Sequence, residues 1–127
     1  MKEYTIEHRV TYKETDQMGV VYYSNYLVWF EMARTELFRA AGICYKSLEE
    51  EGLFLPVAEA QCRYRIPVKY DDVVNIKTKI SNMRRSRITF EYEVTKDGDL
   101  TSTGYTDHAF IDKNGKVVPI PAKVRDM

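Results

Sequence analysis

The segment from Tyr12 to Tyr26 contains residues whose types and spacing could do chemistry. It places the carboxylate of Asp16 in a loop with Gly19, just before an apolar periodic segment that begins near Asn25. A carboxylate at such a place can attack a carbonyl carbon or activate water, while free amides of a helix's first turn stabilise the developing oxyanion. These two groups predict an acyl-transfer site. Spacing alone also allows Asp16 to be an ordinary turn residue, because aspartate side chains accept backbone hydrogen bonds in turns.

A long helix from Asn25 to Ala41 is predicted to position the end of this loop. Ser24 or Asn25 can cap its first turn, and Gly42 suits the left-handed residue that follows its last turn. Further apolar residues lie off the main stripe, so the helix should be covered on more than one side. The residues at helical spacing are Tyr26, Trp29, Phe30, Ala33, Leu37, Ala40 and Ala41.

Alternating apolar and polar residues predict strands before and after this helix. The first runs over residues 4–12, and the later ones over about 54–67, 74–80, 88–94, 101–111 and 117–120. Asp97-Gly98 and Asn114-Gly115 are turn signals between neighbouring strands. Strands joined in this way form an antiparallel meander, and the long helix is the element available to cover its apolar face. The pattern therefore predicts an α+β fold in which a curved sheet wraps around one helix.

Length, charge and cysteine content exclude several classes of protein. The 127 residues suit one domain spanning 1–127, and 19 basic against 19 acidic residues leave no excess charge for nucleic acid or a membrane surface. Cys44 and Cys62 have neither metal-ligand spacing nor nearby histidines, which predicts no metal site and a reduced, cytoplasmic setting. The charged first ten residues lack the apolar core of a signal peptide, and no segment has the roughly 20 apolar residues of a membrane span.

The loop and helix together resemble the signature of the 4-hydroxybenzoyl-CoA thioesterase family of hotdog proteins, which includes the acyl-CoA thioesterases associated with the Tol-Pal system. The resemblance implies a hotdog fold, hydrolysis of an acyl-CoA thioester, and active sites placed between paired subunits. The residues that carry it are Thr15-Asp16, Gly19-Val20-Val21-Tyr22, Asn25-Tyr26-Leu27, Trp29-Phe30-Glu31 and Ala33-Arg34.

The resemblance also implies roles for individual residues. Asp16 occupies the position of the catalytic aspartate, and the backbone amide of Tyr23 that of the group polarising the thioester carbonyl. Two departures from the family pattern stand out: many relatives have histidine in place of Tyr23, and many have aspartate in place of Glu14. The positions expected to bind substrate in this segment are Gly19, Val20, Tyr22, Asn25 and Tyr26.

The phosphates of coenzyme A, which is part of the substrate and not a cofactor, need a basic site. Arg84, Arg85 and Arg87 form the densest positive cluster, and arginine offers bidentate contacts to phosphate. A solvated hairpin tip explains the same cluster equally well. Lys69, beside Tyr70, is the second candidate.

The sequence leaves three functions in competition. Hydrolysis of an acyl-CoA, or of a thioester on acyl carrier protein, uses the carboxylate and needs no metal or redox cofactor. A non-catalytic thioester-binding or scaffold protein of the same fold has no use for Asp16 beside the carbonyl. A hydroxyacyl-thioester dehydratase should need a histidine with a carboxylate, yet His8 and His108 lie outside the loop. The unpaired outer strands of such a sheet predict a homodimer or homotetramer.

Overall fold

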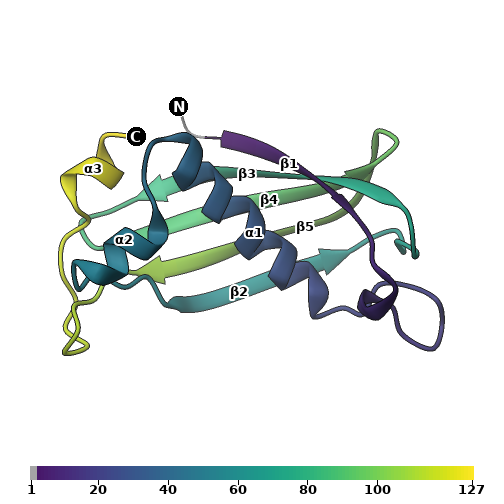
Figure 1. Ribbon diagram of the computed structural model, residues 1–127, viewed down its shortest axis with the longest axis horizontal. Coiled ribbons are helices and arrows are strands. Elements are labelled where there is room, and N and C mark those ends of the chain that lie inside the picture. Colours follow the sequence, from purple (N-terminus) through teal and green to yellow (C-terminus); the bar gives the residue numbers. More distant parts are fainter. Residues whose placement is uncertain (1–2) are drawn as a thin grey trace.

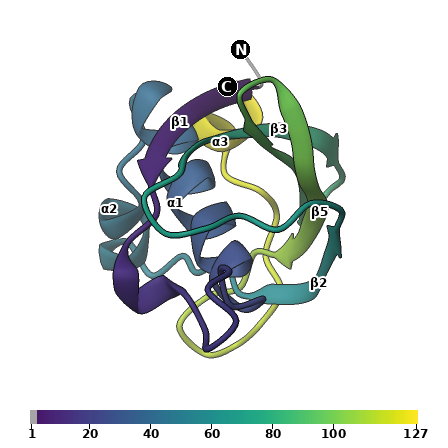
Figure 2. The ribbon, with the colours of Figure 1, turned by 90° about the vertical axis from the view of Figure 1, so that its right-hand side faces the viewer.

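A curved antiparallel sheet wraps around one long helix in the computed structural model, which describes residues 3–127. Figures 1 and 2 show helix α1 lying within the curve of the sheet, whose strand order is β1-β3-β4-β5-β2. This arrangement confirms the predicted α+β hotdog fold. No helix within residues 3–127 is long and apolar enough to cross a membrane. The elements are β1 (Glu3–Arg9), α1 (Asn25–Ala40), α2 (Tyr45–Glu50), β2 (Val57–Tyr64), β3 (Val73–Met83), β4 (Arg87–Lys96), β5 (Asp99–Ala109) and α3 (Ala122–Arg125).

Helix α1 lies very close to the sheet at one place. The ring of Phe30 stacks on that of Tyr92 with centroids 4.1 Å apart. A Cβ atom at Gly104 of β5 would lie 2.6 Å from the Phe30 ring and 2.4 Å from the carbonyl oxygen of Gln61. The absence of a side chain at Gly104 therefore allows Phe30 to reach the strands, and Trp29, Phe30 and Ala33 are fully buried beneath the sheet.

The predicted ends of the first strand and of the long helix need small corrections. Strand β1 ends at Arg9 and not at Tyr12, because Tyr12 begins a 3-10 turn that is closed by a hydrogen bond from the Thr15 N–H to the Tyr12 carbonyl oxygen. Helix α1 ends at Ala40, one residue earlier than predicted, and Gly42 has the expected left-handed φ of 83°. Ser24 is the N-cap residue, although its side chain forms no capping hydrogen bond.

The predicted meander is correct for β3, β4 and β5 and wrong for its two ends. Strand β2 pairs only with β5 and forms the far edge of the sheet, and its residues are largely exposed on both faces. The short last strand predicted at residues 117–120 is wrong as well, since Val117 forms only an isolated bridge with Ile111 and α3 follows. Helix α2 was not predicted.

A chain of polar side chains crosses the core between α1 and the sheet. Arg34 donates to the Tyr92 hydroxyl oxygen at 3.3 Å, and Tyr92 and Thr106 are hydrogen-bonded at 2.5 Å. The fully buried His108 lies 2.8 Å from Thr106 through Nε2 and 3.1 Å from the Leu55 carbonyl oxygen through Nδ1. Because a carbonyl oxygen only accepts, Nδ1 carries the proton and Nε2 accepts from Thr106. Each group in the series then donates its proton to the next acceptor, from Arg34 through Tyr92, Thr106 and His108 to the Leu55 carbonyl oxygen.

The buried His108 in this hydrogen-bonded series predicts a loss of stability of the folded protein in mild acid. Burial, together with the positive charge of Arg34, lowers the pKa of His108 from 6.5 to about 4. The unfolded chain therefore takes up a proton as the pH falls through 6.5, whereas the folded chain does not until about pH 4. The corresponding free energy is about 3 kcal/mol, present above pH 6.5 and lost between pH 6.5 and pH 4.

Urea denaturation at pH 7.5 and at pH 4.5 measures this loss. A His108→Gln variant should be less stable than the wild type at pH 7.5, yet lose about 2 to 3 kcal/mol less on acidification. An equal loss in both proteins would show that His108 does not cause the acid sensitivity.

Candidate active site

Asp16 lies in a tight turn that uses only part of its carboxylate. The Asp16 N–H donates to the Val20 carbonyl oxygen at 2.9 Å, and the Gly19 N–H donates to the Asp16 carbonyl oxygen at 3.0 Å. Oδ1 accepts from the Met18 N–H at 2.8 Å and from the Val20 N–H at 3.4 Å. Oδ2 receives no hydrogen bond from any residue between 3 and 127. One carboxylate oxygen therefore holds the turn, and the other is available for chemistry.

The partly exposed Asp16 borders an open hollow of about 600 Å³. Val20 forms a β-bridge with Lys69, which brings the loop before β3 against the loop after β1. The rings of Tyr12 and Tyr70, with centroids 5.1 Å apart, come from these two loops. The residues that line the hollow are Tyr12, Thr15, Asp16, Gln17, Gly19 and Tyr70.

The two residues just before α1 provide unpaired backbone donors. The Tyr22 N–H donates to the Glu14 carbonyl oxygen, and the Asn25 N–H donates to the Tyr22 carbonyl oxygen. The N–H groups of Tyr23 and Ser24 have no acceptor in the part of the chain that the structure describes. The Tyr64 hydroxyl donates to the Tyr23 carbonyl oxygen at 3.0 Å and so holds this peptide against β2. An oxyanion can accept from such free amides at a helix N-terminus.

The other predicted binding residues of this segment have different surroundings. Tyr22 and Tyr23 are exposed, and their ring centroids are 4.6 Å apart. Tyr26 is buried against Trp29, and burial, with a smaller contribution from Cys62, raises the pKa of its hydroxyl to about 12. The Asn25 side chain donates to the Glu14 carbonyl oxygen at 2.8 Å, so this amide holds the loop in place.

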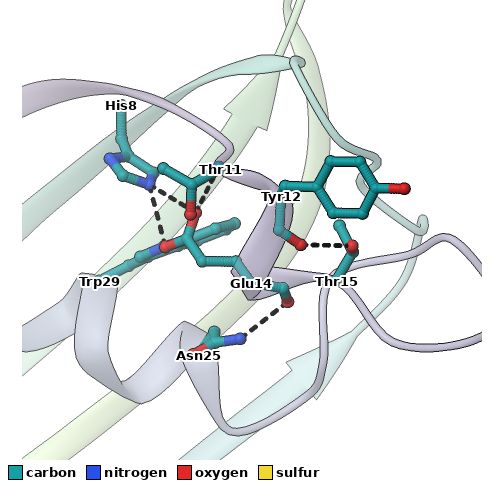
Figure 3. Close-up of polar contacts among 7 residues, drawn as sticks. All are labelled: His8, Thr11, Tyr12, Glu14, Thr15, Asn25 and Trp29. Carbon is teal, nitrogen blue, oxygen red and sulfur yellow. Dashed lines mark hydrogen bonds and ion pairs between the residues drawn. The ribbon is translucent and has the colours of Figure 1, made fainter.

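Glu14 is a residue of the site that the sequence did not single out as functional. Its carboxylate accepts from the Thr11 N–H at 2.8 Å, from Trp29 Nε1 at 2.9 Å and from His8 Nε2 at 3.0 Å, as Figure 3 shows. Burial by itself raises the pKa of Glu14, but these donors outweigh burial and leave the pKa below its usual value. The spacing Thr11-x-x-Glu14, typical of a capping box, is the signal that could have identified it.

The predicted phosphate-binding residues lie in two separate places. Lys69 is beside the Asp16 loop, whereas the β3–β4 turn with Arg84, Arg85 and Arg87 lies at the opposite end of the sheet, near α3 (Figure 1). Arg87 donates to the Asp107 carboxylate from Nε at 3.2 Å. Within residues 3–127 the guanidinium groups of Arg84 and Arg85 take part in no ion pair. One protomer therefore brings Lys69, but not the arginines, close to Asp16.

A model of the thioesterase-like superfamily matches residues 10–127. The chain belongs to this superfamily. Because the match covers the Asp16 loop, α1 and all strands except β1, the family assignment applies to the whole site.

Relatives of this thioesterase-like chain agree with the assignment. A putative esterase of Aquifex aeolicus is 37% identical over 94% of this chain and 92% of its own length. The acyl-CoA thioesterase YbgC of Haemophilus influenzae is 34% identical over 88% of this chain and 82% of its own length. The crystal structure of a DHNA-CoA thioesterase from Staphylococcus aureus superposes with a TM-score of 0.90, at 32% identity over 94% of this chain and 81% of that one. The protein is a thioester hydrolase.

Proposed function

We propose that this protein hydrolyses an acyl-CoA thioester to the free acid and coenzyme A, with Asp16 as the catalytic carboxylate. The observation that carries the proposal is that Oδ2 of Asp16 and the amide of Tyr23 have no hydrogen-bond partner within residues 3–127, and that both belong to the loop between β1 and α1. Acyl transfer needs a group that delivers the nucleophile and a donor for the oxyanion, and these two groups supply them.

Two routes use the same residues. In the first, Asp16 Oδ2 takes a proton from water as the water oxygen attacks the thioester carbon, and the proton then passes to the departing thiolate. In the second, Oδ2 attacks the carbon itself, the C–S bond breaks and coenzyme A leaves as its thiolate; water then hydrolyses the resulting mixed anhydride to the free acid and the Asp16 carboxylate, and the proton released passes to the thiolate. In both, the Tyr23 N–H donates to the carbonyl oxygen as negative charge develops there. A single turnover in ¹⁸O-labelled water tests the second route: when water attacks the Asp16 carbonyl carbon of the anhydride, an unlabelled Asp16 oxygen enters the product acid and ¹⁸O enters Asp16, an exchange that the first route cannot produce.

Two other functions of the same fold receive less support. A dehydratase needs a histidine at the reacting carbon, but His108 is fully buried in the core and His8 donates to Glu14. Neither histidine lines the hollow at Asp16. A non-catalytic thioester-binding protein does not need an unpaired carboxylate oxygen beside the thioester carbonyl, so Oδ2 of Asp16 argues against this function.

A site shared between the subunits of a homodimer would bring together the Asp16 loop and the arginines of the β3–β4 turn, which lie far apart in one protomer. The outer edge of β2 has no partner strand within residues 3–127, and a second copy can cover it by antiparallel pairing. Such pairing reverses one subunit relative to the other. Because the β3–β4 turn and the Asp16 loop lie at opposite ends of one subunit (Figure 1), this reversal brings Arg84 and Arg85 of one subunit to the end where its partner has the Asp16 loop, within reach of the phosphates of coenzyme A.

Replacing Asp16 by asparagine tests the catalytic assignment. Asparagine can keep the turn, since its side-chain oxygen still accepts from Met18 and Val20, but it cannot take a proton or act as a nucleophile. We expect turnover to fall by about 10² to 10⁴-fold with the fold retained. The assay measures thiol release from a panel of short, long and aromatic acyl-CoA esters.

The chain supplies a matched control for this experiment. Asp112 forms the same turn, with Oδ1 accepting from the Asn114 and Lys116 N–H groups and the Gly115 N–H donating to the Asp112 carbonyl oxygen. Asp112→Asn should therefore affect its turn as Asp16→Asn affects the turn at Asp16, but it removes no catalytic group. Near-normal turnover in Asp16→Asn, or an equal loss in Asp112→Asn, would contradict a catalytic role for Asp16.

Removing both unpaired arginines tests the binding of coenzyme A. The Arg84→Ala/Arg85→Ala protein should show a Michaelis constant for acyl-CoA raised by about tenfold or more and a nearly unchanged turnover, because these contacts are remote from the bond that breaks. Added salt should have the same effect on the wild type. Acyl-pantetheine, which lacks the nucleotide phosphates, is the control substrate, and equal impairment with it would exclude phosphate binding by these residues.

Dilution tests whether the site is shared between subunits. If residues of both chains form it, specific activity should fall as the protein is diluted below the dimer dissociation constant. Light scattering and activity measured over the same dilution series give the two quantities to compare. A monomer with full activity would exclude the shared site, although Asp16 could still be catalytic.

A further inference from the structure

We propose that Glu14 is a positioning residue, which sets the place of Asp16 relative to the free Tyr23 amide. The inference rests on the proposed function and extends it to a residue that does not contact the substrate. Glu14 is two residues before Asp16 and does not line the hollow. Its side chain is only 12% exposed, and Figure 3 shows the carboxylate facing inward between β1 and α1.

The side chain of Glu14 joins the loop to two elements. Oε1 accepts from the Thr11 N–H, Oε2 accepts from Trp29 Nε1 of α1, and His8 of β1 contacts both oxygens at 3.0 and 3.1 Å. Because an ionised carboxylate offers only acceptors, His8 Nε2 must carry a proton. The contacts fix the start of the loop against β1 and the second turn of α1.

The main chain of Glu14 acts on the other end of the loop. Its carbonyl oxygen accepts from the Tyr22 N–H and from the Asn25 side chain, both at 2.8 Å. These donors flank Tyr23, the residue whose amide is proposed to bind the oxyanion. One residue therefore connects the chain just before Asp16 with the chain on both sides of Tyr23. A shift of Glu14 would change the distance between the two proposed catalytic groups.

The chemistry of the contacts requires a carboxylate of this length. Thr11 N–H and Trp29 Nε1–H can only donate, and they reach different oxygens of Glu14. A glutamine would have to turn its NH₂ group toward one of them and lose that hydrogen bond. An aspartate keeps both acceptors but is one methylene shorter, so it cannot make both contacts from the same backbone position.

Glu14→Gln, with Glu7→Gln on the exposed face of β1 as the matched control, tests the proposal. We expect turnover of Glu14→Gln to fall by about 10- to 100-fold, with a Michaelis constant changed by less than about threefold, because substrate contacts remain while alignment is lost. Glu14→Asp should retain more activity than Glu14→Gln. In an Asp16→Asn background, Glu14→Gln should reduce turnover by less than about threefold, since it acts through Asp16.

Two measurements report on the contacts without any catalysis. Trp29 is the sole tryptophan, so its fluorescence emission should change in Glu14→Gln and remain as in the wild type in Asp16→Asn and Glu7→Gln. Amide hydrogen exchange over residues 14–25 should be faster in Glu14→Gln than in the wild type. If the wild type hydrolyses no thioester, the proposed function fails, and these two measurements still decide whether Glu14 holds the loop.

Several outcomes would overturn the proposal. Wild-type turnover in Glu14→Gln would exclude a positioning role. Lost turnover with unchanged emission and exchange would mean that Glu14 acts on the substrate directly. A full additional loss in the Asp16→Asn background would mean that it does not act through Asp16. If Glu14→Gln does not fold, the milder Glu14→Asp variant is held to the same criteria.

Discussion

The close packing of α1 against the sheet is the constraint on which the rest of the structure depends. Phe30 can stack on Tyr92 only because Gly104 has no side chain at the point of contact. This contact fixes the depth and direction of the helix within the curved sheet. The helix N-terminus then projects at the end of the sheet where the loops before α1 and before β3 meet. A packing contact in the core therefore determines where the unpaired amides of the site lie.

The sequence predicted the parts of the fold whose residues have an apolar and a polar side. Helix α1 and strands β3, β4 and β5 all face the core on one side, so periodicity and the Asp97-Gly98 turn placed them to within a few residues. Alternation located strand β2, but its place at the edge beside β5 could not be predicted, because that position depends on pairing with residues far along the chain. Helices α2 and α3 are too short for a periodic signal.

The site was only partly predictable for a related reason. Asp16 and Asp112 form the same hydrogen-bonded turn, each with a glycine three residues later, so the local sequence does not distinguish chemistry from turn formation. The two turns differ in the element that comes after them, since only Asp16 precedes the N-terminus of a long helix. Glu14 was noted as a departure from the family pattern, but its three donors come from β1, the turn after it and α1. Their convergence is a property of the tertiary structure.

The strand order also has a consequence for how the protein is synthesised. Strands β3, β4 and β5 follow one another through tight turns, whereas β1 must wait for β3, which lies far along the chain. During translation, β1, the Asp16 loop and α1 leave the ribosome first and have no partner strand until β3 has emerged. The apolar face of α1 is exposed in that interval, so the nascent chain is vulnerable to aggregation before it is capable of catalysis. The first strand to be made therefore stays without its partner while α1, α2 and β2 are synthesised.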